Sequence, residues 1–164
     1  MKWIGLLALS MAGTFVGIAA VKWQHQRVHI LQLLIQWLRD FERRLQYTAP
    51  PVREWLEESA NVFSQLPFIA TVCCALQGDD LQTAWERAVL VSFPRWSAAD
   101  TAPLRALGAQ LGKSEAHTQR RCVQEAVAAL EERRTEALSA AQKADKLYMT
   151  LGLSGGLAMA LLWI

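Results

Sequence analysis

The chain carries no charged side chain in WIGLLALSMAGTFVGIAAV (residues 3–21) or in LYMTLGLSGGLAMALLWI (residues 147–164). At a rise of about 1.5 Å per residue, a helix over either stretch approaches the ~30 Å hydrocarbon thickness of a bilayer. Tryptophan or tyrosine side chains lie near the ends of both stretches, as is typical at membrane interfaces. We therefore expect transmembrane helices over residues 1–23 and 147–164.

The composition of the whole chain excludes two other classes of protein. The 164 residues are 52% hydrophobic and 20% charged, whereas disordered chains combine low hydrophobicity with high net charge. With 17 lysines and arginines against 15 aspartates and glutamates, the net charge of +2 offers no concentrated basic face for nucleic acid. We expect a folded chain that does not bind nucleic acid.

The charges that flank the two stretches predict the orientation of the chain. Four basic residues lie on the inner sides: Lys22, Arg27, Lys143 and Lys146. The outer sides carry only Lys2 and the terminal amine, and positively charged flanks tend to stay in the cytoplasm. Residues 24–146 are therefore expected to form a cytoplasmic domain of a multi-pass cell-membrane protein.

Two other interpretations of these stretches stay open. The first stretch could be a cleaved signal peptide, although it is longer than such segments usually are and no Ala-x-Ala precedes its polar junction. Both stretches could instead be buried helices of a soluble bundle. Uncharged runs of this length at the two extreme ends of the chain favour membrane insertion.

Small residues recur at four-residue spacing within both stretches. Gly13 and Gly17 form one pair, and Gly152 and Gly156 form another. Such spacing places small side chains on one helical face, where two helices in a membrane can approach closely. Glycine is also frequent in membrane helices without such packing. We predict helix packing at these four positions, either within one chain or between subunits.

Between the two stretches, the sequence predicts helices and no strands. Apolar residues recur at the i, i+3, i+4, i+7 spacing of one helical face, as Leu31, Leu34, Ile35, Leu38, Phe41 and Leu45 early in the chain, and as Val123, Val127, Leu130, Ala137, Leu138 and Ala141 late in it. The expected helices cover about 25–47, 51–63, 67–77, 81–91, 101–111 and 115–151. The predicted fold class is all-α, a compact bundle of about six helices flanked by the two transmembrane helices.

Several of the expected helix ends rest on capping residues. Gly78 suits the end of the helix over 67–77, and Asp79 or Asp80 suits the start of the next helix. Adjacent carboxylates could also coordinate a cation, but a cap is the expected role. Gly112 is expected to end the fifth helix, and Ser114 to begin the sixth.

The sequence offers no catalytic or cofactor-binding constellation. It contains no glycine-rich phosphate loop, no HExxH and no GxSxG. His25 and His29 could present two imidazoles to a metal, but no nearby cysteine completes a set, so an exposed pair is expected. Cys73, Cys74 and Cys122 are a poor disulfide framework and are expected to be small buried side chains. We therefore expect no enzyme, no cofactor and no metal.

Three groups of short strings match a known pattern. They are Ala75-Leu76-Gln77-Gly78 with Leu81 and Ala84-Trp85, then Leu107-Gly108 and Leu111-Gly112-Lys113-Ser114 with Gln119, and finally Lys146-Leu147-Tyr148 with Leu151-Gly152. In order and spacing, the chain resembles the stage III sporulation protein AB family of endospore-forming bacteria over essentially its whole length. The first string is similar to one in the cytoplasmic domains of the related type II secretion F-protein superfamily. Glu115, Met149 and Thr150 depart from the family pattern.

The resemblance implies a platform protein in the channel complex that the mother cell builds in the membrane facing the forespore. Its implied partners are a secretion-type sporulation ATPase and other membrane subunits of the complex, together with membrane lipid. A second copy of the chain is a further candidate partner. The resemblance carries over no catalytic residue.

The alternative function is a membrane-anchored helical receptor or regulator that binds a soluble signalling protein. Co-purification of an ATPase would distinguish the two. A transporter subunit or an enzyme would require ionisable side chains within the two stretches. The serines and threonines there do not ionise, and they are Ser10, Thr14, Thr150 and Ser154.

Overall fold

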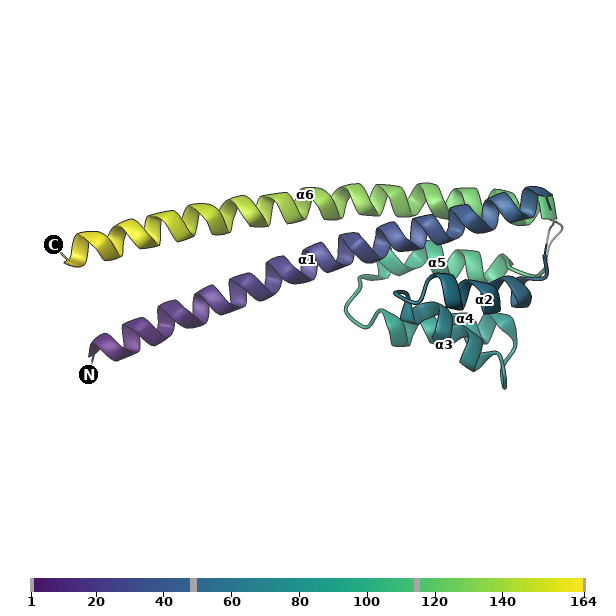
Figure 1. Ribbon diagram of the computed structural model, residues 1–164, viewed down its shortest axis with the longest axis horizontal. Coiled ribbons are helices and arrows are strands. Elements are labelled where there is room, and N and C mark those ends of the chain that lie inside the picture. The colour runs from purple at the N-terminus through teal and green to yellow at the C-terminus, as the bar shows by residue number, and fades with distance from the viewer. Residues whose placement is uncertain (1, 48–49, 114–115, 164) are drawn as a thin grey trace. The chain divides into compact units, whose positions relative to one another are not determined.

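The structure, a computed structural model, is built from α-helices. It describes the backbone of residues 2–47, 50–113 and 116–163, and the side chains of residues 22–47, 50–113, 117–148 and 150. The helices are α1 (Lys2–Tyr47), α2 (Val52–Val62), α3 (Pro67–Ala75), α4 (Leu81–Ser92), α5 (Ala98–Gln110) and α6 (Ala116–Trp163), as Figure 1 shows. The described backbone contains no strand, so the predicted all-α class is confirmed.

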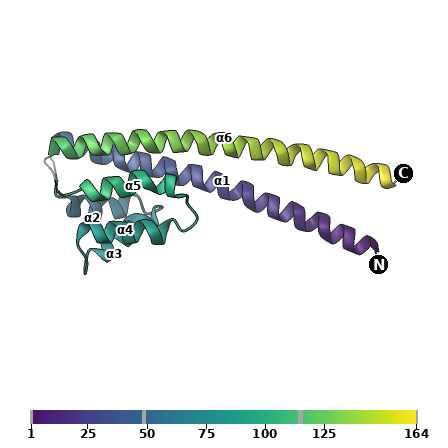
Figure 2. The ribbon, with the colours of Figure 1, turned by 180° about the vertical axis from the view of Figure 1, so that it is seen from behind.

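The chain divides into two compact units. Unit 1 comprises residues 1–29 and 135–164, and unit 2 comprises residues 30–134. Helices α1 and α6 contribute to both units, whereas α2 to α5 belong wholly to unit 2. In Figure 1 and, from behind, in Figure 2, these four short helices lie together along the part of α1 that belongs to unit 2. The domain boundaries at residues 23 and 146 remain predictions.

The predicted apolar stripe of α1 lies in the core of unit 2. All six of its members are buried: Leu31, Leu34, Ile35, Leu38, Phe41 and Leu45. Trp37 is fully buried as well, so the buried face is wider than the predicted stripe. The polar residues between these positions, such as Gln32 and Gln36, are exposed. The amphipathic pattern therefore identifies both the helix and the face that it buries.

Side-chain caps fix the first residues of α4 and α5. Asp80 accepts a hydrogen bond from the backbone N–H of Thr83 at 3.3 Å, which confirms that an aspartate caps α4. Ser97 and Asp100 form a reciprocal capping box at the start of α5. Helix α5 consequently begins at Ala98, and the predicted start at Thr101 is wrong.

The two glycines predicted to end helices behave differently. Helix α3 ends at Ala75 with Leu76 as its cap, so the predicted cap at Gly78 is wrong. Gly78 lies in the following turn, where its N–H donates to the carbonyl oxygen of Ala75 at 3.2 Å. Gly112 follows α5 with a φ of 78°, a left-handed conformation that favours glycine, so this predicted end is confirmed. Ser114, the predicted cap of α6, lies outside the described residues.

An aromatic cluster fills the centre of unit 2. Trp37 of α1 stacks on Trp55 of α2 with ring centroids 4.5 Å apart, and on Trp85 of α4 with centroids 5.9 Å apart. Phe68 of α3 meets the rings of both Trp37 and Trp85 edge-on. Such pairs contribute about 0.5–1.5 kcal/mol each beyond the burial of their surface. The cluster therefore joins four helices, and Trp37 and Trp85 belong to the core.

Helix α6 is attached to α1 by polar contacts within each unit. In unit 2, Glu42 accepts a hydrogen bond from Gln124 at 2.6 Å and lies 3.7 Å from the guanidinium of Arg120. In unit 1, Nε2 of His25 lies 3.2 Å from each carboxylate oxygen of Asp145.

The predicted apolar stripe of α6 is largely buried. Its buried positions are Val123, Val127, Leu130, Ala137 and Ala141, and Leu138 is half-buried.

Among the residues that the structure describes, no helix has both the length and the apolar character needed to cross a bilayer. The predicted stretch at 3–21, and all but three residues of the stretch at 147–164, lie outside the described side chains. The transmembrane helices therefore stay predictions.

Candidate interaction surface

The ionisable residues singled out in the sequence do not assemble into a catalytic or metal site. In the described part of the chain, no group of three or more histidine, cysteine, aspartate or glutamate side chains could hold a metal ion. His25 faces Asp145, whereas His29 and His117 are exposed. The predicted alternative in which His25 and His29 share a metal has no third ligand among these residues.

The cysteines are free thiols that take no part in a disulfide bond. Cys73 and Cys122 are half-buried and Cys74 is exposed, so the prediction of small buried side chains is wrong for Cys74. Burial raises the pKa of the Cys73 thiol, and the nearby carboxylate of Glu57 raises it further. Because the thiolate is the nucleophilic form, Cys73 is a weak nucleophile.

Both carboxylates between α3 and α4 are occupied within the protein. Hydrogen bonds from the side chain and the backbone N–H of Thr83 lower the pKa of Asp80. Asp79 forms an ion pair with Arg87 at 2.6 Å. Asp80 therefore caps α4, and Asp79 forms an ion pair with a residue of the same helix.

The strings that resemble one family come together in space at the contact between α4 and α5. A Cβ atom at Gly108 would lie 2.2 Å from Cδ1 of Trp85, so only glycine leaves room for this indole ring. The indole N–H of Trp85 donates to the carbonyl oxygen of Leu104 at 2.7 Å. The absence of a side chain at 108 therefore allows Trp85 to pack on the α5 backbone and to reach its acceptor.

A second contact of this kind joins the ends of the same two helices. A Cβ atom at Gly112 would lie 3.2 Å from a methyl group of Leu81, and Nζ of Lys113 donates to the side-chain oxygen of Gln82 at 2.5 Å. The other family positions on these helices, Ala84, Leu107 and Leu111, are buried. These positions therefore determine how α4 packs on α5, and they do not form a surface for a partner.

The remaining predicted positions are not brought together. Gly78 is exposed in a turn, Gln119 is half-buried on α6, and Lys146, Leu147 and Tyr148 are exposed in unit 1. Ser114 lies outside the described residues. The predicted packing glycines lie where the structure describes the backbone alone, and they are Gly13, Gly17, Gly152 and Gly156.

A polar hollow of about 720 Å³ lies on unit 2 between α1 and the end of α2. Its α1 side consists of Gln36, Arg39, Asp40, Glu42, Arg43, Arg44 and Gln46, and its α2 side consists of Val62 and Phe63. Val62 leaves 70% of its surface exposed. The hollow thus combines several charged groups with an exposed aliphatic side chain.

Most charges of this hollow are paired with neighbouring helices. Arg44 binds Glu58 of α2 at 2.5 Å and Asp40 at 2.9 Å, and these hydrogen bonds raise its pKa. Arg39 pairs with Glu131 of α6. Arg43 is held more loosely, since its guanidinium lies 3.3 Å from Asp40 and its side chain is 75% exposed. Arg43 is therefore the cation most able to bind a carboxylate from outside.

A smaller groove of about 260 Å³ lies between α5 and α6. Small and apolar residues such as Pro103, Ala106 and Ala129 line it, together with Cys122 and Glu125. It offers few groups that could orient a ligand.

Sequence reasoning missed the hollow because its residues lie on two helices, within 36–46 of α1 and at 62–63 at the end of α2, and spacing along one helix does not show which helices meet. Spacing gives no signal for Val62 either, because it lies seven residues after the buried Trp55 and therefore on the same face of α2.

Comparison with known proteins gives a match over nearly the whole chain. The profile of the family described as stage III sporulation protein AB matches residues 2–164. A solved structure titled stage III sporulation protein AB (SpoIIIAB) is similar in fold, with a TM-score of 0.62, 20% sequence identity, and coverage of 71% of this chain and 97% of that one. A search of curated protein sequences found no match.

The family profile begins at residue 2 and extends to the last residue, and therefore includes every string quoted from the sequence. The chain belongs to the stage III sporulation protein AB family.

Proposed function

We propose that this chain is a non-enzymatic platform of the channel complex between the mother cell and the forespore. Two transmembrane helices hold it in the mother-cell membrane that faces the forespore. Its helical bundle docks a secretion-type ATPase in the cytoplasm and passes conformational changes to the other membrane subunits. The observation that carries this proposal is the family match over residues 2–164, which gives the chain a role in sporulation.

The construction of unit 2 supports a docking role. Its centre is a stacked aromatic cluster that joins α1, α2, α3 and α4, so the unit offers a fixed surface to a partner. Binding to a preformed surface costs less conformational entropy than binding to one that must first be ordered. The chemistry suits a partner that is a protein, because the hollow between α1 and α2 combines ion pairs with an exposed valine.

Recovery of the ATPase from sporulating cells tests this proposal. The full chain, tagged and expressed from its own promoter, is purified with membrane-solubilising detergent, and the bound proteins are identified by mass. We expect a secretion-type ATPase among them. Recovery of a soluble signalling protein without any ATPase would instead favour the membrane-anchored regulator.

A matched pair of arginine variants locates the docking surface. Arg43→Glu reverses the loosely held charge in the hollow and should lower ATPase recovery by about tenfold, since placing like charges against each other across an interface is costly. Arg121→Glu is the control, because Arg121 is 77% exposed and also pairs with a carboxylate on its own helix, Glu125, at 3.0 Å. Equal losses in the two variants would contradict docking at the hollow.

A further inference from the structure

An apolar surface without acidic side chains covers one end of unit 2. It is formed by the exposed residues of the segment 88–99, AVLVSFPRWSAA, in which Ala88, Val89 and Phe93 are buried. The segment includes the last turn of α4 and the connection to α5. Leu90 and Val91 leave 60% and 64% of their surfaces exposed. Arg95, also exposed, is the one ionisable residue of this segment. We call the residues of this segment that are not buried the α4–α5 patch.

The acidic residues nearest in sequence lie outside this patch. Asp100 is buried and engaged in the capping box with Ser97. Glu86 lies one turn earlier on α4, where its carboxylate accepts a hydrogen bond from Gln82 at 3.3 Å. The exposed surface of the patch is therefore aliphatic with one positive charge, whereas the hollow between α1 and α2 carries both signs of charge.

The patch is fixed to the core of the unit. Trp96 stacks on Phe93 with ring centroids 4.3 Å apart, and Phe93 stacks on Phe68 of the central aromatic cluster at 5.6 Å. Phe93 is buried and Trp96 is half-buried. Arg95 consequently lies on a packed connection, and Leu90 and Val91 lie in the last turn of α4 that leads into it.

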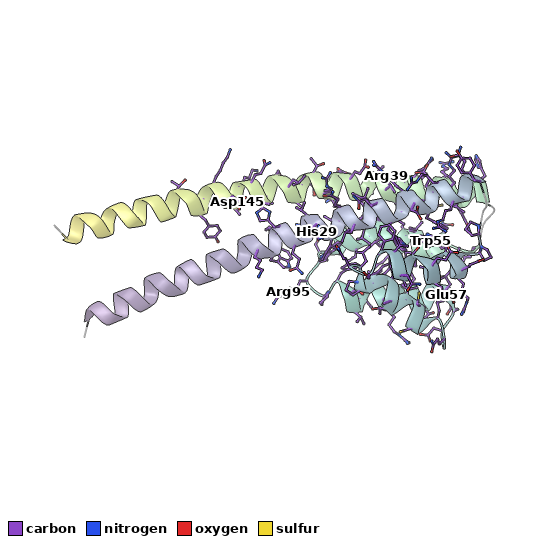
Figure 3. The ribbon with its side chains drawn as sticks, in the orientation of Figure 1. His29, Arg39, Trp55, Glu57, Arg95 and Asp145 are labelled. Atoms are coloured by element: carbon purple, nitrogen blue, oxygen red, sulfur yellow. The ribbon has the colours of Figure 1, made fainter. Side chains whose placement is uncertain are left out.

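The connection lies at the end of unit 2 where α1 enters, as Figures 1 and 3 show. Figure 3 labels Arg95 at this end, whereas Glu57 of α2 lies farther along the unit. Helix α1 enters unit 2 at Ile30, nine residues after Val21, the last residue of the first uncharged stretch.

We infer that the α4–α5 patch contacts the surface of an anionic lipid bilayer, an inference that rests on the membrane insertion in the proposed function. Leu90 and Val91 enter the boundary between headgroups and acyl chains, and the guanidinium of Arg95 binds a lipid phosphate. Aliphatic side chains beside arginine and tryptophan are the chemistry of interfacial membrane segments. A protein partner fits less well, because the patch has no acidic or amide side chain to complete the polar rim of such an interface.

Site-specific photocrosslinking of the full chain tests this inference. Benzoylphenylalanine replaces Leu90 in one variant and the exposed Glu57 in a control variant, and both are reconstituted in vesicles of phosphatidylglycerol and phosphatidylethanolamine. After irradiation, the mass of each adduct identifies what lay next to the probe. We expect phospholipid adducts at position 90 to exceed those at position 57 by about fivefold or more, as expected for a segment at the membrane interface.

Two arginine variants test the role of charge. Arg95→Glu should lower the adduct yield at position 90 in these anionic vesicles, and pure phosphatidylcholine should lower it in the unaltered chain. Arg105→Glu, which changes an exposed arginine of α5 outside the patch, should leave the yield unchanged. Equal adduct yields at positions 90 and 57 would overturn the inference, and so would adducts of Leu90 with a second copy of the chain or another protein.

Carbonate extraction of the same vesicles separates this inference from the proposed function. If carbonate releases the chain, the membrane insertion that the proposed function requires is wrong. If the chain is retained and position 90 yields no lipid adduct, only the inference about the patch is wrong.

Discussion

Gly108 on α5 lies so close to Trp85 on α4 that any side chain at position 108 would overlap the indole ring. The same ring donates a hydrogen bond to the carbonyl oxygen of Leu104 and stacks on Trp37 of α1. A change at this glycine therefore disturbs the α4–α5 contact, a buried hydrogen bond and the central aromatic cluster together.

Gly108→Ala should accordingly lower the free energy of unfolding by about 3 kcal/mol, as expected when a well-packed core is overfilled. Urea denaturation of the solubilised full chain, followed by tryptophan fluorescence, measures the effect. The control is Gly78→Ala, because a Cβ at Gly78 meets nothing within 4 Å and the backbone there is not left-handed. If both variants are equally stable, the close approach of Trp85 to Gly108 is wrong.

Gly112 supports a second prediction, which rests on backbone conformation. Its φ of 78° lies in the left-handed region, where a Cβ costs roughly 1–2 kcal/mol. Gly112→Ala should lose at least this much stability, with an added cost from the methyl group of Leu81 at 3.2 Å. Gly112→Asn should lose less than Gly112→Ala, because asparagine tolerates this conformation better than alanine does. The reverse order of the two variants, measured in the same denaturation assay, would contradict the backbone explanation.

Substitution of Ser59 should raise the free energy of unfolding, whereas the two glycine substitutions should lower it. Its side chain is buried on α2, and its hydroxyl has no hydrogen-bond partner among the described residues. A buried hydroxyl without a partner costs about 1–3 kcal/mol, and alanine also has the higher helix propensity. Ser59→Ala should therefore raise the free energy of unfolding by about 1 kcal/mol.

The comparison for Ser59 is Ser97→Ala, the same substitution at a serine that caps a helix. Ser97 accepts a hydrogen bond from the backbone N–H of Asp100 at 3.2 Å, so its removal should cost about 1 kcal/mol. A loss of stability in Ser59→Ala would indicate that its hydroxyl has a partner in the folded protein.

The sequence predicted best those features that repeat along one helix. The stripe from Leu31 to Leu45 was recognised because its spacing repeats every three or four residues, and every member is buried. The start of α5 was missed because it depends on a capping box of four residues, Ser97 to Asp100, which precedes the predicted start at Thr101. The sequence does not predict the end of α3, because a glycine that follows a helix favours a cap at Gly78, whereas the helix ends at Ala75.

Long-range contacts could not be predicted from spacing at all. Trp85 and Gly108 belong to two of the strings that carry the family resemblance, yet nothing in either string shows that the ring lies over the glycine. The hollow between α1 and α2 likewise depends on Arg44 meeting Glu58 across two helices. Such pairs follow from the packing of helices and become visible only in three dimensions.

Asp80 should make the stability of the protein depend on pH. Hydrogen bonds from Thr83 lower the pKa of this carboxyl in the folded state below its ordinary value of 3.8. Its contribution is therefore fully present above pH 3.8 and is lost as the pH falls through the lowered pKa of the folded state. Asp80→Asn keeps an oxygen that can accept from the N–H of Thr83 but removes the charge.

The natural chain should thus be more stable than Asp80→Asn near neutral pH, and the difference should shrink at acidic pH. Chemical denaturation of both chains between pH 7 and pH 2.5 measures this, and the comparison cancels the titration of other groups. A difference that stays constant over this range would show that the ionised cap contributes nothing.

Ala137 tests whether α6 acts as a rigid element in the proposed platform. Helix α6 continues from Ala116 to Trp163, and Ala137 is buried within it. Proline at this position removes a helix hydrogen bond and clashes with the preceding turn, which kinks a helix at a cost of about 3 kcal/mol or more. Ala137→Pro should therefore reduce spore formation while the chain stays in the membrane fraction and still recovers the ATPase.

Ala137→Gly is the matched control, because it costs only about 1 kcal/mol of helix stability and introduces no kink. Normal spore counts in the proline variant would show that the proposed transmission along α6 is wrong.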